Sequence, residues 1–370
     1  MRRFTMIAVA LGLVLAASLA PAQDQPKNVL IIGWDGCQRA HLQEMIARHE
    51  VPNLMTLVHH GALVDVEVSS GATDTKAGWA QILTGYSPDL TGVYSNHVYR
   101  PIPQGYTIFE RVEQALGPDN VFTAMILGKK GNVEATGGRK IPYEQWEKTQ
   151  IRKQQRQGKP AVAPRQVTEG TVVEENGQKF VVIPGKPYLN AHKGMDLFVN
   201  GLNKNEVVGT RAMAELAAHK DQRFLVFVHF GDPDDTGHMC GENSQEYTDA
   251  IKSDDEWTGK IIAHLKDLGL YDHTLVYITA DHGFDEGQKH HNYAPHVFLA
   301  TNDKAVQRKG DRADLAPTVL QRFGLDLAAI TPALTGISYD QEAPDRGVLG
   351  RLAAKKPKKY SQRQAEGGAG

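Results

Sequence analysis

The sequence "NVLIIGWDG", residues 28–36, is an uninterrupted apolar run that ends in Gly-Trp-Asp-Gly. An apolar run without alternation is typical of a strand buried on both faces, as the strands of parallel sheets are. Such a strand would carry Asp35 at its carboxyl end. Because the active sites of open α/β sheets collect at the carboxyl ends of strands, this stretch predicts both the fold class and the edge where the chemistry lies.

Three later apolar runs also end in polar side chains. They are "VFTAMILGKKG" (121–131), "RFLVFVHFGDPDDTGH" (223–238) and "TLVYITADHG" (274–283), and they deliver Lys129, then Asp232, Asp234, Asp235 and His238, and finally Asp281 and His282. Helical patterns such as residues 246–268 lie between the runs. Strands that alternate with helices indicate an α/β fold, with a largely parallel central sheet covered by helices on both faces.

Residues 131–193 interrupt this alternation. The segment "YEQWEKTQIRKQQRQGK" indicates a polar helix or a solvated segment, and "TVVEENGQKFVVI" indicates a hairpin around Asn176-Gly177. We expect an insertion here, which is either a small cap beside the active site or a purely structural excursion. The catalytic core would then comprise residues 23–130 and 194–345.

The two ends of the chain differ in composition from this core. Residues 1–22 contain two arginines, an apolar run and a small-residue cleavage site that ends at Ala22, which are the features of a signal peptide. We therefore expect an exported protein, periplasmic or extracellular, with no transmembrane anchor after cleavage near Ala22. Residues 346–370 are predicted to be a disordered basic tail, because residues 351–370 hold six basic residues and one acidic residue.

The charge balance excludes one class of partner. The chain has 41 basic and 43 acidic residues, and loss of Arg2 and Arg3 with the signal peptide leaves a net charge of −4. Binding of a nucleic-acid polymer by bulk charge is therefore not expected, and a small-molecule substrate is. The chain has two cysteines, Cys37 and Cys240, and the sequence leaves their pairing open.

The polar residues at the strand ends suit a metal centre. Each of them alone would also fit a turn or a solvated loop, but together they form a set of carboxylates and imidazoles without a thiolate. Such ligands suit zinc or a similar first-row ion better than calcium or magnesium. The set is larger than one ion needs and suits two ions. The candidates are Asp35, Asp234, His238, Asp281, His282 and the pair His290-His291.

The stretch "GATDTKAGWAQILTG" (71–85) predicts a loop that leads into the N-terminus of a helix. The free backbone N–H groups and the partial positive charge at such a terminus suit anions. Thr75 therefore has two interpretations. Its hydroxyl either caps the helix or faces a substrate.

The order of these residues resembles the alkaline phosphatase superfamily, and most closely its nucleotide pyrophosphatase/type I phosphodiesterase branch. In that branch a Thr nucleophile stands nine residues before a Thr-Gly pair, as Thr75 does before Thr84-Gly85, and a phosphate-binding Asn follows it by twenty-one residues, which is Asn96 here. The resemblance covers residues 28–130 and 222–345. It implies an alkaline-phosphatase-like three-layer α/β/α sandwich with a small inserted cap.

The resemblance also implies roles for the site residues. The chain would be an exported two-metal phosphoester hydrolase in which Thr75 forms a phospho-enzyme intermediate and Asn96 binds the phosphate. One zinc ion would be held by Asp35, Thr75, Asp281 and His282. The other would be held by Asp234, His238 and either His290 or His291, with His291 favoured. Another first-row divalent ion would also fit these ligands.

Lys129 leaves the substrate open. The segment "TAMILGKKG" (123–131) is also similar to a sulfatase segment whose lysine binds the sulfate group. Lys129 would then contact a substrate oxygen and favour monoesters, unless it is an exposed lysine at a strand end. The run Thr75-Lys76-Ala77-Gly78-Trp79 lacks the Cys or Ser, the Pro and the Arg of the sulfatase motif, so we predict a phosphoester hydrolase. A phosphotransferase and a non-catalytic metal-binding protein are the alternatives.

Overall fold

The computed structural model describes residues 28–156, 158, 160–164 and 166–344. The predicted signal peptide (1–22) and the predicted basic tail (346–370) lie outside the described residues. Within the described part of the chain, no helix is both long enough and apolar enough to cross a membrane.

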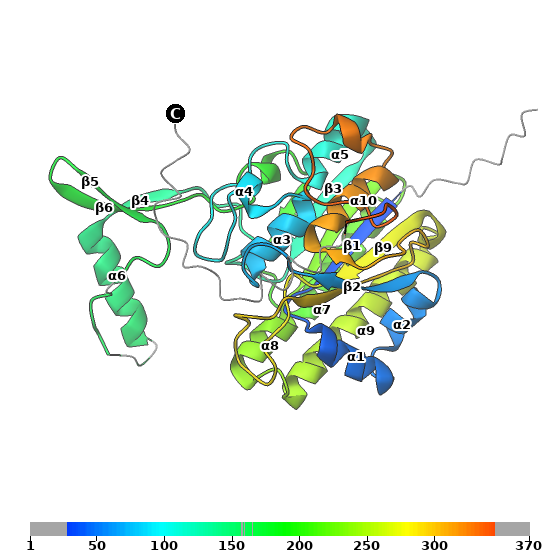
Figure 1. Ribbon diagram of the computed structural model, residues 1–370, viewed down its shortest axis with the longest axis horizontal. Coiled ribbons are helices and arrows are strands. Elements are labelled where there is room, and N and C mark those ends of the chain that lie inside the picture. The colour runs from blue at the N-terminus through cyan, green and yellow to red at the C-terminus, as the bar shows by residue number, and fades with distance from the viewer. Residues whose placement is uncertain (1–27, 157, 159, 165, 345–370) are drawn as a thin grey trace, which may run out of the picture.

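A large sheet forms the centre of the fold (Figure 1), and in the described residues it has the strand order β11-β2-β10-β9-β1-β8-β3-β7. Its strands are β1 (Asn28–Trp34), β2 (Ala62–Glu67), β3 (Phe122–Leu127), β7 (Leu197–Val199), β8 (Phe224–Phe230), β9 (Thr274–Thr279), β10 (His296–Thr301) and β11 (Gly310–Asp311). Strand β10 is antiparallel to its neighbours β2 and β9. The other neighbouring pairs are parallel, so the predicted largely parallel sheet is confirmed.

The central strands are buried because their sequences are apolar on both faces. Every residue of β1, β3 and β8 is buried. Strand β1 lies between β8 and β9, with Gly33 opposite His229 on one side and Thr279 on the other. Since these three strands are parallel and adjacent, the residues that follow them meet at one edge of the sheet.

Two layers of helices cover the sheet (Figure 1). One layer holds α1 (Arg39–Ala47), α2 (Pro52–His59), α7 (Asn205–Ala218), α8 (Asp232–Cys240) and α9 (Gln245–Asp267), with α9 in contact with α2, α7 and α8. The other holds α3 (Thr75–Thr84), α4 (Pro88–Thr91), α5 (Ile108–Leu116) and α10 (Leu315–Arg322), with α10 in contact with α3 and α5. Short 3-10 helices are η1 (Pro118–Asn120), η2 (Ala191–Lys193), η3 (Tyr271–His273), η4 (Arg312–Asp314) and η5 (Leu327–Ala329). This arrangement is the predicted three-layer α/β/α sandwich.

A second, smaller unit projects from the sandwich (Figure 1). It contains a sheet of order β4-β6-β5 and one helix, and these elements are β4 (Arg139–Pro142), α6 (Tyr143–Arg156), β5 (Thr171–Glu175) and β6 (Gln178–Ile183). Strands β5 and β6 form the predicted hairpin, in which Asn176 and Gly177 both have positive φ, as a two-residue hairpin turn requires. The unit lies within the predicted insertion, residues 131–193, whose boundaries stay a prediction.

The two cysteines do not form a disulfide. Cys37 is buried and Cys240 is exposed, and both are free thiols. The pairing that the sequence left open is therefore absent, and no disulfide between Cys37 and Cys240 holds the site together.

Candidate active site

The candidate residues follow β1, β8 and β9 and converge at the edge where these strands end. Asp35 comes directly after β1, Asp234 lies in the first turn of α8 behind β8, and Asp281-His282 closely follow β9. Asp35, Asp281 and His282 are completely buried, and Asp234 is nearly so. The convergence results from the parallel pairing of the strands and not from proximity in the sequence.

A first group of possible metal ligands consists of Asp35, Asp281 and His282. The Nε2 atom of His282 lies 3.7 Å from Oδ1 of Asp35 and 3.5 Å from Oδ2 of Asp281. The other oxygen of the Asp281 carboxylate accepts a hydrogen bond from the backbone N–H of Gly36. These three residues agree with three of the four ligands that the resemblance implied for one ion.

A second group surrounds the Oδ1 atom of Asp234. The Nε2 atoms of His282 and His291 each lie 3.7 Å from this oxygen, and Nε2 of His238 lies 3.4 Å from it. The Nε2 atoms of His238 and His291 are 3.2 Å apart. His282 thus lies beside both groups, a sharing that the separate ligand sets expected from the sequence did not include.

Backbone carbonyl groups orient all three imidazoles. The Nδ1 atoms of His282, His291 and His238 lie 2.9, 2.5 and 2.9 Å from the carbonyl oxygens of Gly283, Thr73 and Lys289. An Nδ1–H group that donates to a carbonyl leaves the Nε2 lone pair free for a metal ion. Burial lowers the pKa of His291 to about 4, so its imidazole is neutral at pH 7. Both features suit metal binding.

The cluster contains buried polar atoms that have no hydrogen-bond partner among the described residues. These are Oδ1 of Asp234, Oδ2 of Asp281 and Nε2 of His282. Buried polar atoms in folded proteins are nearly always paired, because an unpaired one costs free energy. Two carboxylate oxygens and an imidazole nitrogen turned toward one another are the donor set of zinc and related divalent ions, so the residues fit such a group.

His290 lies outside the cluster. Its side chain is 51% exposed, and its Nδ1 atom lies 2.8 Å from Oδ2 of Asp285. Of the two neighbouring histidines that the sequence could not separate, the structure therefore brings His291, and not His290, to Asp234.

Lys129 reaches the cluster from the end of β3. Its ammonium group donates hydrogen bonds to Asp35, at 2.8 Å from Oδ1, and to Asp234. Its side chain is 10% exposed, so the interpretation of Lys129 as an exposed lysine at a strand end is wrong. Burial alone would lower the pKa of Lys129, but the carboxylates of Asp234 and Asp35 raise it above its usual value. A fixed positive charge therefore stands between the two groups of ligands.

Two further residues hold Asp35, and no motif in the sequence indicated them. The Nε2 atom of His229 in β8 lies 2.8 Å from Oδ2 of Asp35, and the Trp79 indole N–H of α3 points at the same oxygen from 3.5 Å. Although burial would raise the pKa of Asp35, Lys129 and His229 hold it below its usual range. His229 lies inside an apolar strand and belongs to no recognisable motif. Only the pairing of β1 with β8 shows that it contacts Asp35.

Thr75 is the first residue of α3, not its cap. The N-cap is Asp74, whose Oδ1 accepts a hydrogen bond from the backbone N–H of Ala77 at 3.4 Å. The interpretation of Thr75 as a plain N-cap is therefore wrong. Its side chain is buried, and its hydroxyl has no hydrogen-bond partner among the described residues. The hydroxyl is available for another role.

Two features hold the start of α3 close to the cluster. A Cβ on Gly78, one turn after Thr75, would lie only 2.5 Å from Cβ of Asp281, so the helix approaches Asp281 as closely as a glycine allows. The buried guanidinium of Arg312 donates to the backbone carbonyl groups of Asp281, at 2.7 Å, and of Ser70, at 2.9 Å. Arg312 is a positioning residue that the sequence analysis did not identify.

Asn96 is held at the start of α3 by the residues on either side of Thr75. Its backbone N–H donates to Oδ2 of Asp74 at 2.7 Å, and its Oδ1 accepts from the backbone N–H of Lys76 at 2.9 Å. The Lys76 ammonium group donates to the backbone carbonyl of Asn96 at 2.8 Å. The side-chain NH₂ of Asn96 remains without a partner among the described residues, beside the Thr75 helix terminus.

Comparison with known proteins places this arrangement in a family. The sequence profile described as type I phosphodiesterase / nucleotide pyrophosphatase matches residues 29–355. The chain belongs to this family. The family acts on phosphoesters, and the alkaline-phosphatase-like fold that the resemblance implied agrees with it.

Individual relatives match the chain over shorter stretches. Mouse ectonucleotide pyrophosphatase/phosphodiesterase family member 7 is 42% identical over 59 residues, which are 16% of this chain and 13% of the mouse protein. The 2,3-bisphosphoglycerate-independent phosphoglycerate mutase of Clostridium botulinum strain ATCC 19397 is 27% identical over 176 residues, 42% of this chain and 30% of the mutase. The chain thus matches less than a third of the length of either relative.

A solved structure supports the fold. A protein in the alkaline phosphatase superfamily from Vibrio parahaemolyticus has a TM-score of 0.50 and 16% sequence identity, over 86% of this chain and 71% of that one. This likeness shows a shared fold. The chemistry of this protein therefore has to be inferred from its own residues.

The contacts of Lys76 predict that it positions Asn96. Replacement Lys76→Met keeps most of the side-chain volume but removes the hydrogen bond to the Asn96 carbonyl, so kcat/KM on phosphoesters should fall on the order of tenfold. In a double-mutant cycle, Asn96→Ala should make the added Lys76→Met change nearly silent. Lys130→Met, on an exposed neighbour of Lys129, is the control. Independent losses in the double variant would contradict the positioning role.

Proposed function

We propose that this protein is a metal-dependent hydrolase of phosphoric esters that works through a phosphothreonine at Thr75, with two zinc ions or another first-row divalent ion. The observation that carries the proposal is the set of unpaired buried ligand atoms of Asp234, Asp281 and His282 beside the start of α3. Export after cleavage near Ala22 and a small-molecule phosphoester as the substrate are parts of the same proposal.

The ligand groups divide between two ions. Asp35, Asp281, His282 and Thr75 would hold one, and Asp234, His238 and His291 would hold the other. When bound, such ions would lower the pKa of a hydroxyl ligand and offset the negative charge that builds up on phosphate oxygens. The Nε2 lone pairs of the three imidazoles, which face the cluster, support metal binding.

Groups of the protein itself would bind the substrate and attack phosphorus. The backbone N–H groups at the start of α3 and the NH₂ group of Asn96 would bind the non-bridging oxygens and place phosphorus in line with Oγ1 of Thr75. As the Oγ1–P bond forms, the Thr75 hydroxyl loses its proton, the bond from phosphorus to the leaving oxygen breaks, and the leaving oxygen takes up a proton from water. Water then cleaves the phosphothreonine and releases phosphate or a phosphomonoester.

Lys129 bears on the choice between diesters and monoesters. Its ammonium group is held between Asp35 and Asp234 and has little exposed surface. If it moves to a phosphate oxygen when substrate binds, it would offset the additional charge of a monoester. A phosphomonoesterase that uses Lys129 is therefore the second candidate function. Transfer to an alcohol rather than to water is a third, which the similarity to phosphoglycerate mutases supports.

The nucleophile assignment predicts the effect of changes at Thr75. Thr75→Ala removes the attacking oxygen, so turnover of phosphoesters should fall on the order of a thousandfold or more, while both metal ions remain bound. Thr75→Ser should retain measurable turnover and trap a phosphoserine that mass spectrometry detects after an acid quench. Wild-type rates in Thr75→Ala would rule out the nucleophile.

The two neighbouring histidines provide a matched test of the metal centre. His291→Ala removes a proposed ligand, so the zinc content measured by elemental analysis after gel filtration should fall by one ion per chain. The loss of affinity should exceed the roughly 10–100-fold that outer partners of a metal ligand cost. His290→Ala should retain all zinc. Chelation should abolish activity and added zinc restore it; full activity of a metal-free sample would contradict the proposal.

Lys129 predicts a substrate preference that three chromogenic esters can measure. The esters are a phosphodiester, a phosphomonoester and a sulfate monoester, with Thr75→Ala as the blank. If Lys129 binds a phosphate oxygen, Lys129→Met should lower kcat/KM for the monoester by about tenfold more than for the diester. Equal losses on both phosphoesters would assign the lysine to the structure of the cluster. Preference for the sulfate would contradict phosphoester hydrolysis.

A further inference from the structure

The loop between β9 and β10 supplies one proposed metal ligand and orients another. We call residues 285–291 the ligand loop, and it contains no helix or strand. Its last residue, His291, places Nε2 3.7 Å from Oδ1 of Asp234. The backbone carbonyl of Lys289 in the same loop lies 2.9 Å from Nδ1 of His238 and so orients that imidazole. Whatever holds the ligand loop therefore holds two of the three ligands proposed for the second ion.

Glu242, in the turn between α8 and α9, contacts the ligand loop through both its side chain and its backbone. Oε2 of its carboxylate accepts a hydrogen bond from the backbone N–H of Gly287 at 2.9 Å. Its own backbone N–H donates to the carbonyl oxygen of Gln288 at 3.0 Å. Glu242 is 1% exposed, so its carboxylate depends on donors from the protein rather than from water. The two hydrogen bonds attach the middle of the ligand loop to a buried residue.

His41 of α1 holds the other oxygen of the Glu242 carboxylate. Its Nδ1 lies 2.9 Å from Oε1 of Glu242, and its Nε2 lies 3.0 Å from Oγ1 of Thr248 in α9. His41 and Thr248 are both buried. A buried carboxylate is costly unless hydrogen bonds satisfy it, and here both oxygens of Glu242 have a partner. The proposed chemistry does not use this buried pair, so its place beside the ligand loop needs another explanation.

Two other contacts between the ligand loop and this part of the fold involve exposed residues. The side chain of Asn243 donates to the carboxylate of Glu286, and the ammonium group of Lys289 donates to the backbone carbonyl of Met239. All four residues are exposed, so water competes for both hydrogen bonds. These contacts leave Glu242 as the buried anchor of the loop on this side.

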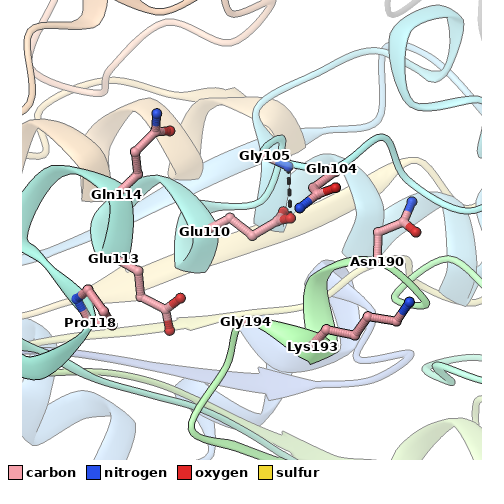
Figure 2. Close-up of a pocket in the computed structure, with 9 residues that line it drawn as sticks. All are labelled: Gln104, Gly105, Glu110, Glu113, Gln114, Pro118, Asn190, Lys193 and Gly194. Carbon is pink, nitrogen blue, oxygen red and sulfur yellow. Dashed lines mark hydrogen bonds between the residues drawn. The ribbon is translucent and has the colours of Figure 1, made fainter.

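Glu110 provides a matched comparison (Figure 2). It lines a cavity of about 570 Å³ beside α5. Its carboxylate accepts a hydrogen bond from the backbone N–H of Gly105, at 2.7 Å, and takes part in the capping box at Thr107. Glu110 thus also ties a loop to its surroundings through a backbone N–H. Among the described residues it makes no hydrogen bond with the ligand loop, which distinguishes it from Glu242.

We propose that Glu242, backed by His41, is a positioning residue that holds the ligand loop where the second metal ion binds. This inference rests on the proposed function, because that function assigns the second ion to Asp234, His238 and His291. Without the Glu242 carboxylate the loop loses its buried anchor, and the imidazoles of His238 and His291 are no longer preorganised. The second ion then binds more weakly, while the ion at the other ligand group stays bound.

Cobalt(II) titration of the metal-free full chain, followed by visible absorption, tests this role without measuring turnover. The binding step that His291→Ala abolishes identifies the second ion. Glu242→Ala should weaken this step by roughly 10–100-fold, the usual cost of losing an outer partner of a metal ligand, and change the first step less than twofold. Glu242→Gln keeps an acceptor for the N–H of Gly287, so its affinity should stay within about threefold of the wild type.

Two further variants separate positioning from general destabilisation. Glu110→Ala removes the matched carboxylate and should lower the melting temperature, but it should leave both cobalt steps unchanged. Glu242→Asp keeps the charge on a side chain one methylene shorter, so it should give an intermediate loss, and it serves as the test if Glu242→Ala does not fold. Equal losses of cobalt affinity in Glu110→Ala and Glu242→Ala would mean general destabilisation and would overturn the assignment.

Hydrogen–deuterium exchange of the metal-free protein measures the loop directly. Exchange of residues 285–291 should be on the order of tenfold faster in Glu242→Ala than in the wild type and unchanged in Glu110→Ala, because only the former releases the N–H of Gly287. Unchanged exchange, or an unchanged second cobalt step, would overturn the positioning role. Both measurements are independent of Thr75, so a wrong nucleophile would leave their results intact. A wild-type chain without a second cobalt step would contradict the two-metal function and this inference together.

Discussion

The rest of this structure depends on three carboxylates that are buried side by side. Asp35, Asp234 and Asp281 gather where β1, β8 and β9 end, and buried like charges are unfavourable unless cations lie close to them. Lys129 supplies one such charge between Asp35 and Asp234. Burial and the charge of Asp35 raise the pKa of Asp281 well above its usual value. Bound metal ions would relieve the remaining repulsion, which is why we interpret the cluster as a candidate metal centre.

The cluster also determines how helix α3 packs. Helix α3 can reach Asp281 because Gly78 has no side chain, and Arg312 fastens the backbone of Asp281 to the loop before α3. Asp74 then serves both as the helix cap and as the anchor of Asn96. Residues from widely separated parts of the chain thus hold Thr75 in place, and loss of any one of them should disturb catalysis without touching substrate.

The inserted unit is connected to this centre by polar contacts rather than by a shared core. Glu169, Tyr99 and Lys186 form a charged bridge whose near end is Lys76, next to Thr75. Burial, together with the charge of Lys186, lowers the pKa of Lys76 to about 8.

The sequence by itself determined the three-layer fold and the ligand-bearing strand ends, because uninterrupted apolar runs and their polar termini are local properties of residues such as those of 28–36. It also determined the spacing of Thr75 and Asn96, which the family resemblance interpreted. Only the tertiary structure decided that His291 rather than His290 faces Asp234, that His229 supports Asp35 and that Lys129 lies between Asp35 and Asp234. These outcomes depend on strand order and loop paths, which bring together residues that no local pattern connects.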